Sequence, residues 1–231
     1  MDVWEAIIKR RTVRNFSRVP VEFDKIAMML EAGTYAPNSG NLQNWKFIVV
    51  TDKEIIKDIH NYCLDQVWIN TASVLIVVCG LPDLASEKYG IRGERLYTTQ
   101  NSAAAIENML LVAETLDLGT AWIGAFDEEK IKNIFSIPEN VRAQAIIAVG
   151  YADYEAPEKI MQPLDSQIYF NAYGMNVKRL DVALYDYYQR VNEIAKDISN
   201  YMGKSNTNAA KVLKEKFEDF KKNVKSLLEL K

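Results

Sequence analysis

The chain has 231 residues, of which 48% are hydrophobic and 26% are charged, and its formal net charge is −3 at pH 7. A chain of this length and composition can bury a sizeable core in one or two domains, whereas a dedicated nucleic-acid binder would usually be clearly basic. No apolar run approaches the roughly 18 residues needed to cross a bilayer. We therefore expect neither a membrane span nor a nucleic-acid partner.

The residue types that usually carry catalysis are scarce. The chain has one histidine, His60, and two cysteines, Cys63 and Cys79, whose spacing matches no metal-binding motif. A zinc site, a disulfide and a Ser-His or Cys-His catalytic pair are therefore not expected. Residues 1–5 lack the basic and apolar regions of a signal peptide, so we expect a reducing, cytoplasmic location. If the protein is an enzyme, a cofactor is expected to carry the difficult chemistry.

The first helix is expected at residues 2–10, and a basic segment follows it. Arg10, Thr12 and Arg14 recur at every second position, which favours an extended strand whose alternate side chains share one face. Two guanidinium forks and a hydroxyl on one face suit an anionic, planar ligand. A solvated basic turn would explain the same pattern, and this stretch alone does not separate the two interpretations.

Expected helices and strands alternate along the next part of the chain, and a polar loop at residues 36–44 interrupts them. This loop combines glycine with asparagine, serine and glutamine, which suit turns and hydrogen bonds to a ligand. Residues 81–93 are rich in glycine, proline and charge, so a loop or lid is expected there. Gly119 is expected to end the long buried helix that follows. The alternation favours a layered α/β core. Helices are expected at residues 21–35, 53–64, 97–116 and 128–135, the last capped by Asp127, and strands at residues 45–50, 74–79, 121–123 and 144–151.

The tail that begins at residue 178 differs from the rest of the chain. Its net charge is +4, against −7 for the residues before it. Apolar residues recur at steps of three and four in two stretches separated by residues 203–208, which is the signature of an αα-hairpin. We expect a core domain at residues 1–177 and an appended helical extension at residues 178–231, packed on the body or on a dimer partner.

Five segments, taken in order, resemble the motifs of the nitroreductase family of FMN-dependent flavoproteins. Residues 10–16 (RRTVRNF) are similar to the family pattern R-R-S-x-R-x-F, and residues 36–45 (APNSGNLQNW) to A-P-S-x-x-N-x-Q-P-W. Residues 108–120 are similar to q-N-m-l-L-A-a followed by G-L-g-t. The segment WIGAF follows at residues 122–126, and residues 148–151 (AVGY) are similar to l-G-y-p.

The resemblance extends over residues 2–165 and implies an α+β fold with three layers, in which helices flank a central mixed, mainly antiparallel sheet. It also implies a homodimer with FMN at the subunit interface. The implied activity is electron transfer from NAD(P)H to a nitroaromatic, a quinone or a similar small acceptor by a ping-pong mechanism. Two alternatives remain open. One is a flavoprotein of the same fold that dehalogenates its substrate or fragments flavin under a closing lid, and the other is a non-enzymatic flavin-binding protein.

The resemblance assigns the basic segment near the N-terminus to FMN. Arg10 would contact the phosphate, while Arg11 and Thr12 would hold the phosphate and the ribityl chain through backbone and hydroxyl groups. Arg14 would reach the pyrimidine edge of the flavin, where a permanent positive charge stabilises the negative charge that reduction places there. Arg14 is therefore expected to be a catalytic residue as well as a cofactor ligand.

Two further segments of the same subunit would complete this half of the site. The amide of Gly124 would point at flavin N5, which makes Gly124 the second expected catalytic residue, with Ile123 and Ala125 beside it. Lys159 would contact the phosphate from the stretch after the last strand. The family often has K-x-R there, and Met161 stands in place of its arginine. Fewer cations would then share the phosphate.

The polar loop at residues 36–44 would come from the partner subunit. Asn38 stands where the family pattern has serine, and Asn44 stands where it has proline. Trp45 and Trp122 are expected in the core rather than against the flavin, because large aromatic side chains dominate cores. The loop residues expected to contact FMN are Pro37, Asn38, Ser39 and Asn41.

Overall fold

The computed structural model describes residues 1–176, and the predicted helical hairpin at residues 178–231 lies outside this range. The chain divides into two compact units, Met1–Lys159 and Ile160–Lys231. The first unit holds the sheet and all the residues that the sequence assigns to a site. The fold that positions the site is therefore the fold of this first unit.

Four strands within residues 1–176 form one sheet: β1 (Trp45–Val50), β2 (Val74–Gly80), β3 (Gly119–Ile123) and β4 (Arg142–Gly150). Their order is β1-β2-β4-β3, and each neighbouring pair is antiparallel. The predicted layered core is correct, but the antiparallel pairing makes the fold α+β, as the resemblance implies, rather than α/β. A single parallel bridge joins Thr12 to Thr120 on the edge strand β3, outside the four antiparallel strands.

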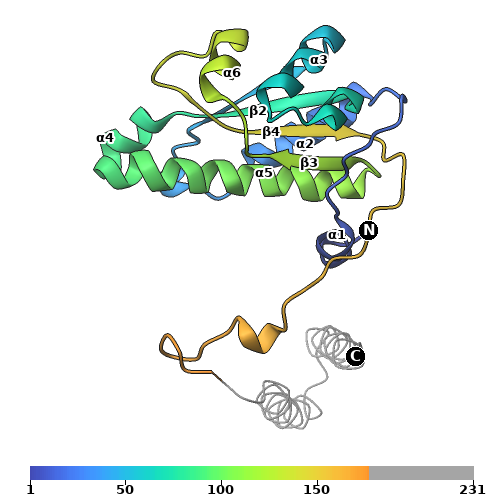
Figure 1. Ribbon diagram of the computed structural model, residues 1–231. Coiled ribbons are helices and arrows are strands. Elements are labelled where there is room, and N and C mark those ends of the chain that lie inside the picture. Colours follow the sequence, from blue (N-terminus) through green and yellow to red (C-terminus); the bar gives the residue numbers. More distant parts are fainter. Residues whose placement is uncertain (177–231) are drawn as a thin grey trace, which may run out of the picture. The chain divides into compact units, whose positions relative to one another are not determined.

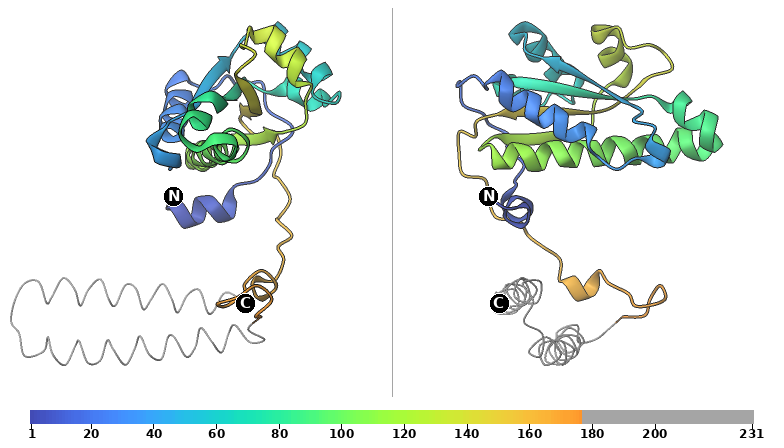
Figure 2. Two further views of the ribbon diagram at one scale, coloured as in Figure 1. Left: turned by 90° about the vertical axis from the view of Figure 1, so that its left-hand side faces the viewer. Right: turned by 180° about the vertical axis from the view of Figure 1, so that it is seen from behind.

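Helices cover both faces of the sheet. The described helices are α1 (Val3–Lys9), α2 (Phe23–Thr34), α3 (Lys53–Tyr62), α4 (Pro82–Arg92), α5 (Thr98–Thr115) and α6 (Glu128–Phe135), with short 3-10 helices at Ser39–Asn41, Val67–Thr71 and Leu164–Ser166 and a π-helical turn at Gly93–Tyr97. Figures 1 and 2 show α2 and α5 on one face and α3 and α6 on the other. Within residues 1–176, no helix combines the length and apolarity that a membrane crossing requires.

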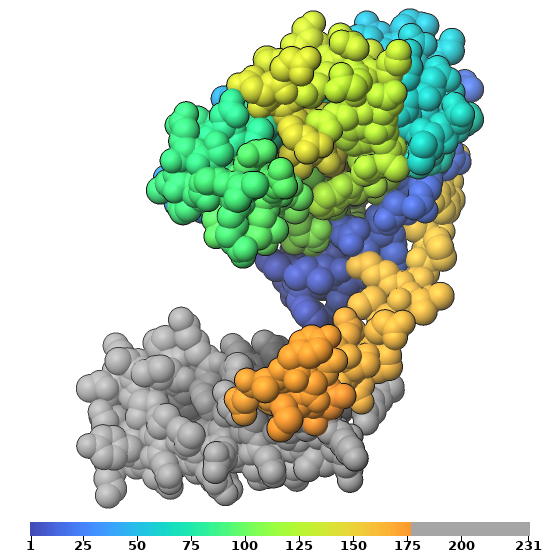
Figure 3. All heavy atoms as spheres, turned by 60° about the vertical axis from the view of Figure 1, so that its left-hand side comes forward, coloured from blue at the N-terminus to red at the C-terminus, as the bar shows by residue number. Residues whose placement is uncertain are grey.

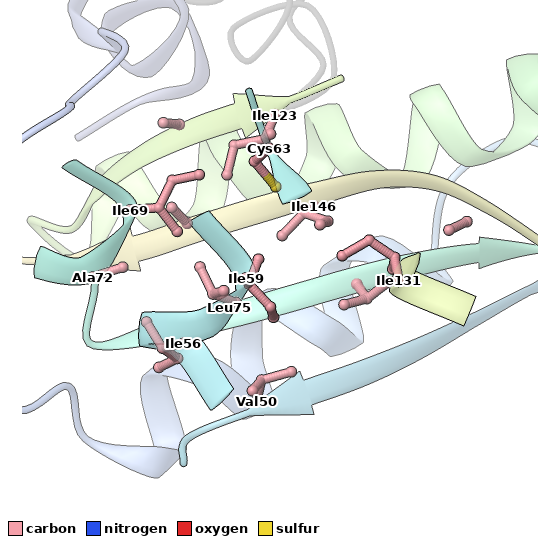
Figure 4. Packing of buried hydrophobic residues seen from close by; sticks show 14 of the residues in the cluster. Val50, Ile56, Ile59, Cys63, Ile69, Ala72, Leu75, Ile123, Ile131 and Ile146 are labelled. Carbon is pink, nitrogen blue, oxygen red and sulfur yellow. The ribbon is translucent and has the colours of Figure 1, made fainter. Parts of the chain in front are cut away.

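Strand β2 lies at the centre of the core, and all its residues are buried. Alternate side chains point to opposite faces of a strand. Leu75 and Val77 therefore pack with α3 and α6, where Figure 4 shows Leu75 among isoleucines of these elements. Ile76 and Val78 pack with α2 and α5 on the other face. A strand buried on both faces is expected to be apolar throughout, which explains why its continuous apolar run predicted a strand at residues 74–79.

The loop expected at residues 81–93 is wrong, because this segment forms α4 and the first residue of the π-helical turn. Pro82 occupies the first turn of α4, where proline is favoured because its fixed φ suits the helix and its missing N–H would be unpaired anyway. Gly90 has φ +58° and bends the segment. Proline and glycine here mark the start and a kink of a helix rather than a loop.

The expected glycine cap of α5 is also wrong. Asp117 has φ +59° and takes the left-handed position, while Gly119 is the first residue of β3. The N–H of Leu118 donates to the carbonyl of Ala113 at 2.9 Å, and the N–H of Asp117 donates to the carbonyl of Glu114 at 3.2 Å. This is the Schellman pattern with aspartate in place of the usual glycine.

Candidate functional site

The basic segment after α1 runs in an extended conformation along the edge of the sheet. The N–H of Val13 donates to the carbonyl of Thr120 at 2.9 Å, and Phe16 forms an antiparallel bridge with Ala152. Val13 and Phe16 are buried, so they anchor the segment, while Thr12 and Arg14 remain exposed. In Figure 3, the blue atoms of this segment lie beside the gold atoms of the chain that follows β4.

Three cations gather where α1 ends. The ammonium of Lys159 donates to the carbonyl of Ile7 at 2.9 Å, and Arg11 Nε donates to the carbonyl of Pro157 at 3.2 Å. The pKa of Lys159 is lowered by burial and then by the positive charges of Arg10 and Arg11. The structure therefore brings together three of the residues that the resemblance assigned to one anion.

The side chain of Arg11 is occupied by main-chain carbonyls. Its guanidinium donates to the carbonyls of Ile8, Lys9 and Arg10, the last of which lies 3.2 Å away. These are carbonyls at the end of α1, which the helix itself leaves unpaired. Arg11 therefore caps α1, and only its backbone and its charge are available for the predicted contact.

Two carboxylates of α5 balance part of this positive charge. Glu107 Oε1 lies 3.7 Å from Arg10 Nε. The pKa of Glu114 is raised by burial, an effect that the positive charges of Arg10 and Arg11 oppose. Sequence reasoning did not single out Glu107 or Glu114, although both are charged and the other residues of α5 are uncharged.

The far end of β3 presents an open main-chain turn. Ile123 is buried, and Gly124 and Ala125 after it are exposed. A Cβ atom on Gly124 would have only Trp122 Nε1 within 4 Å, at 3.9 Å. Gly124 follows Thr120 by four residues, which corresponds to about 13 Å along a strand. The extended segment at Thr12 and the open turn thus lie at opposite ends of the same edge strand.

The two tryptophans have different environments. Trp45 is 5% exposed, so its predicted core position is confirmed. Trp122 is 43% exposed, and its predicted core position is wrong. Alternate residues of the edge strand face the core, and Trp122 lies between the buried Ala121 and Ile123, so its side chain points away from that core.

Arg14, which the resemblance assigned to the pyrimidine edge, is also exposed, and its N–H donates to the hydroxyl of Tyr154 at 3.3 Å.

The polar loop is held in a conformation that few residue types adopt. Gly40, Asn41 and Gln43 have φ values of +57°, +56° and +47°. Asn38 Oδ1 accepts the N–H of Gln43 at 2.9 Å, which closes the loop on itself. Gly40 adopts its positive φ at no steric cost, because it has no Cβ, and the ends of the Tyr89 and Lys88 side chains of α4 lie against it.

Within residues 1–176 of one chain, the loop makes no polar contact with the cations. No hydrogen bond or ion pair among residues 1–176 joins residues 37–41 to Arg10, Arg14 or Gly124. Instead, Ser39 donates to Asn101 of α5, both from its N–H at 3.0 Å and from its hydroxyl at 3.2 Å. Pro37 and Asn41 are exposed.

The buried cysteines are not part of this arrangement. Burial raises the pKa of Cys63 and of Cys79 to about 11. Thiolate is the reactive form, so neither thiol is a nucleophile at neutral pH. Both cysteines are free and buried in the same hydrophobic cluster, Cys63 at the end of α3 and Cys79 in β2.

The comparisons with known proteins identify the family. The model described as Nitroreductase family matches residues 7–79 and 64–151. The chain belongs to the nitroreductase family. A protein of Archaeoglobus fulgidus, named as a candidate NADH dehydrogenase/NAD(P)H nitroreductase, is 32% identical over 162 residues, which are 66% of this chain and 90% of that protein.

Two other relatives extend the nitroreductase comparison. A nitroreductase family protein of Clostridium difficile 630, solved as a crystal structure, matches with a TM-score of 0.66 and 28% identity, over 74% of this chain and 99% of that chain. The FMN reductase (NADPH) of Bacillus subtilis strain 168 is 24% identical over 210 residues, which are 85% of this chain and 82% of that protein. The nitroreductase resemblance and the α+β fold predicted from it are thereby confirmed, and membership makes this chain an oxidoreductase.

Proposed function

We propose that this protein is an FMN-dependent oxidoreductase that passes electrons from NAD(P)H to nitroaromatics, quinones or similar small acceptors. The oxidoreductase class and the FMN cofactor follow from family membership. The acceptors and a ping-pong order of binding are our proposal. The observation that carries it is the edge strand β3, which has three cations near its start and an open turn at its end.

The residues present fit FMN. The ligand must be anionic at one end, because Arg10, Arg11 and Lys159 gather there with only partial compensation from α5. At the other end, Gly124 leaves room for a planar group to lie against the main chain. A phosphate joined by a flexible chain to a flat ring system has both properties.

Each residue of this half of the site then has a role. Arg10 and Lys159 would hold the phosphate through charge-assisted hydrogen bonds, and the hydroxyl of Thr12 would bond to the ribityl chain. Arg14 would place a permanent positive charge beside the pyrimidine edge, and the Gly124 N–H would hydrogen bond to the ring between Ile123 and Ala125. When bound, FMN supplies the electron-transfer chemistry that no side chain of the protein can supply.

We also propose that the active form is a homodimer in which the loop residues Pro37, Asn38, Ser39 and Asn41 of one subunit complete the site of the other. The lack of polar contacts between the loop and the cations among residues 1–176 of one chain supports this proposal. Exposed apolar side chains on α1, including Trp4, Ile7 and Ile8, offer surface for association. A two-fold dimer would use the same surfaces twice.

The alternative with a closing lid would use residues 81–93, which form α4 rather than a loop, as the segment that folds over a substrate. The non-enzymatic alternative depended on a tail that covers the flavin, and that tail lies outside the described residues.

The first test is spectroscopic. The purified full-length protein should bind FMN and show a flavin absorbance band, and NADH or NADPH should bleach the band under anaerobic conditions. Subsequent addition of a quinone or a nitroaromatic should restore it. A protein that does not take up added FMN would overturn the proposal, and a flavin band that neither nucleotide bleaches would favour the non-enzymatic alternative.

The dimer is tested by mixing two variants. Arg10→Ala impairs the cation cluster, and Gly40→Val impairs the loop because a β-branched residue is strained at φ +57°. Each variant alone should bind little FMN. After the subunits are exchanged, a mixed dimer has one site with both halves intact and one with neither, so about half of the wild-type FMN occupancy of each mixed dimer should return. If no occupancy returns after exchange, the loop does not act across the interface.

A further inference from the structure

A buried polar network lies where the loop meets the rest of the fold. Asn44, Thr98 and Asn101 are 1%, 0% and 4% exposed, in a region otherwise packed with apolar side chains. Asn101 Nδ2 donates to Asn44 Oδ1 at 2.7 Å, and Asn44 Nδ2 donates to Thr98 Oγ1 at 3.1 Å. Buried polar groups persist only when they are paired, so these three side chains depend on one another.

Main-chain groups at the ends of the network determine which way each amide points. The N–H of Ser39 can only donate, so Asn101 must present Oδ1 to it at 3.0 Å. Asn101 then presents Nδ2 to Asn44, so the atom of Asn44 that accepts this hydrogen bond must be Oδ1. The Nδ2 of Asn44 is left facing a carbonyl that can only accept, that of Leu81, at 3.1 Å. The Asn44 amide thus accepts with one atom and donates with the other, as its two neighbours require.

The network connects two segments that are far apart in the sequence. At one end, Ser39 belongs to the polar loop. At the other end, Leu81 precedes α4, and Thr98 donates from its hydroxyl to the carbonyl of Gly93 at 3.0 Å, where the π-helical turn begins. The carbonyl of Asn44 also accepts the N–H of Leu81 at 2.9 Å. Both ends of α4 are therefore held by the residues that hold the loop.

Close packing makes this attachment rigid. A Cβ atom on Gly93 would collide with the carbonyl of Ala85, so the turn packs directly on α4. On the surface, Lys88 of α4 also donates to the carbonyl of Gly40 at 3.3 Å. This outer contact is exposed and contributes little by itself, whereas breaking the inner network would leave buried polar groups unpaired.

We infer that Asn44 is a positioning residue that couples the polar loop, residues 38–43, to the α4 segment, residues 81–97. Asn44 stands where the family pattern has proline, which has no side-chain amide, so the coupling depends on a residue in which this chain departs from that pattern. Where the inference concerns ligands, it rests on the proposed function: a shift of α4 would then reach the loop that contacts FMN.

Hydrogen–deuterium exchange of the full-length protein without added flavin tests the coupling directly. Asn44→Asp keeps the shape of the side chain but places a carboxylate oxygen against the carbonyl of Leu81. Exchange should rise about tenfold in residues 38–43 and in residues 81–97 together, as expected when a buried polar pair is broken. A rise in only one segment, or in neither, would overturn the inference.

Asn108→Asp is the matched control. Asn108 lies on α5, and like Asn44 it donates from Nδ2 to a main-chain carbonyl, that of Ala32 in α2, at 3.0 Å. The same chemical change should therefore raise exchange in α2 and leave residues 38–43 and 81–97 as in the wild type. If Asn108→Asp loosens both of these segments equally, the effect of Asn44→Asp reflects general destabilisation and the inference fails.

Thr98→Val tests the same coupling independently, from the other end of the network. It removes the hydroxyl without changing the shape. Thr98 makes no hydrogen bond with Ser39, and its polar connection to the loop runs through Asn44 and Asn101, so a rise in exchange at residues 38–43 is expected by that route. An exchange rate of residues 38–43 in Thr98→Val equal to that of the wild type would overturn the inference. These measurements need no flavin. A wild-type protein that fails to bind FMN would therefore defeat the proposed function and leave the coupling result standing.

Discussion

Arg10 Nε lies 3.7 Å from Oε1 of Glu107, and both side chains are partly exposed to solvent. The residue proposed to hold the FMN phosphate thus has a carboxylate counterion supplied by α5 of the same chain. A phosphate bound at Arg10 would compete with this carboxylate for the same guanidinium. An exposed ion pair of this kind contributes only about 0.2–1 kcal/mol, so a phosphate can displace it.

Glu107→Gln is therefore expected to tighten FMN binding by about 1.5- to 5-fold, which is the equivalent of losing that ion pair. Quenching of flavin fluorescence during titration of the apoprotein measures Kd. The gain should shrink at high salt, because screening weakens the ion pair in the wild type. Glu129→Gln, which neutralises an exposed carboxylate on α6, should leave Kd unchanged. A weaker Kd for Glu107→Gln would mean that the carboxylate supports the site rather than competing with the phosphate.

Arg14→Ala is expected to lower the reduction potential of bound FMN, because the variant loses a positive charge proposed to lie beside the ring edge that becomes negative. A shift of a few tens of millivolts is expected, since about 30 mV corresponds to about 1.4 kcal/mol for two electrons. Equilibration with a reference dye measures the potential. Arg14→Lys should keep the potential close to the wild-type value, and Arg18→Ala should not change the potential. An unchanged potential in Arg14→Ala would place Arg14 elsewhere.

The pH dependence of FMN binding should report on Lys159. Its pKa is lowered by burial and by Arg10 and Arg11, so the ammonium loses its charge at a lower pH than an ordinary lysine. FMN affinity should fall as the pH rises through this lowered pKa. In Lys159→Arg the fall should move to higher pH, because a guanidinium stays charged. Kd measured from about pH 7 to about pH 10 decides this, since ordinary lysine titrates near the upper limit. Identical profiles for the two proteins would exclude Lys159 from the phosphate site.

Acid stability should depend on Glu128, which accepts from Arg142 Nε and Nη2 at 3.0 and 2.6 Å. The hydrogen bond from Arg142 lowers the pKa of Glu128. A carboxyl with a lowered folded-state pKa stabilises the protein above its unfolded pKa, and this stability is lost as the pH falls through the folded value. Glu128→Gln should cost about 0.5–1 kcal/mol at neutral pH, because the pair is partly exposed.

Urea unfolding at neutral and acid pH tests this prediction. The free energy of unfolding of Glu128→Gln should change less between the two conditions than that of the wild type. Glu129→Gln, one residue further along α6, should behave like the wild type in both. An equal loss of stability in acid for Glu128→Gln and the wild type would show that the Arg142 pair does not contribute to the acid-side dependence.

Local signals predicted much of the fold. Strand β1 begins and ends at the predicted residues, 45 and 50, because its β-branched and aromatic residues follow a turn-rich loop. Asp127 caps α6 as predicted, accepting from the N–H of Lys130 at 3.1 Å. The errors lie at α4 and at Asp117, where glycine and proline content suggested a loop or a cap. At these positions the tight packing around Gly93 and the hydrogen bonds at the end of α5 decided the backbone conformation.

The sequence by itself determined the kinds of residues in the candidate site and their order along the chain: Arg10, Arg14 and Gly124 follow from motifs whose chemistry is local. Only the tertiary structure decided that Glu107 lies beside Arg10 and that Asn101 lies beside Ser39, 62 residues away in the chain. The periodicity of α5 predicts which of its faces is buried, but contacts between distant segments depend on how helices and loops pack on the sheet. That packing is a property of the whole core, and no local pattern contains it.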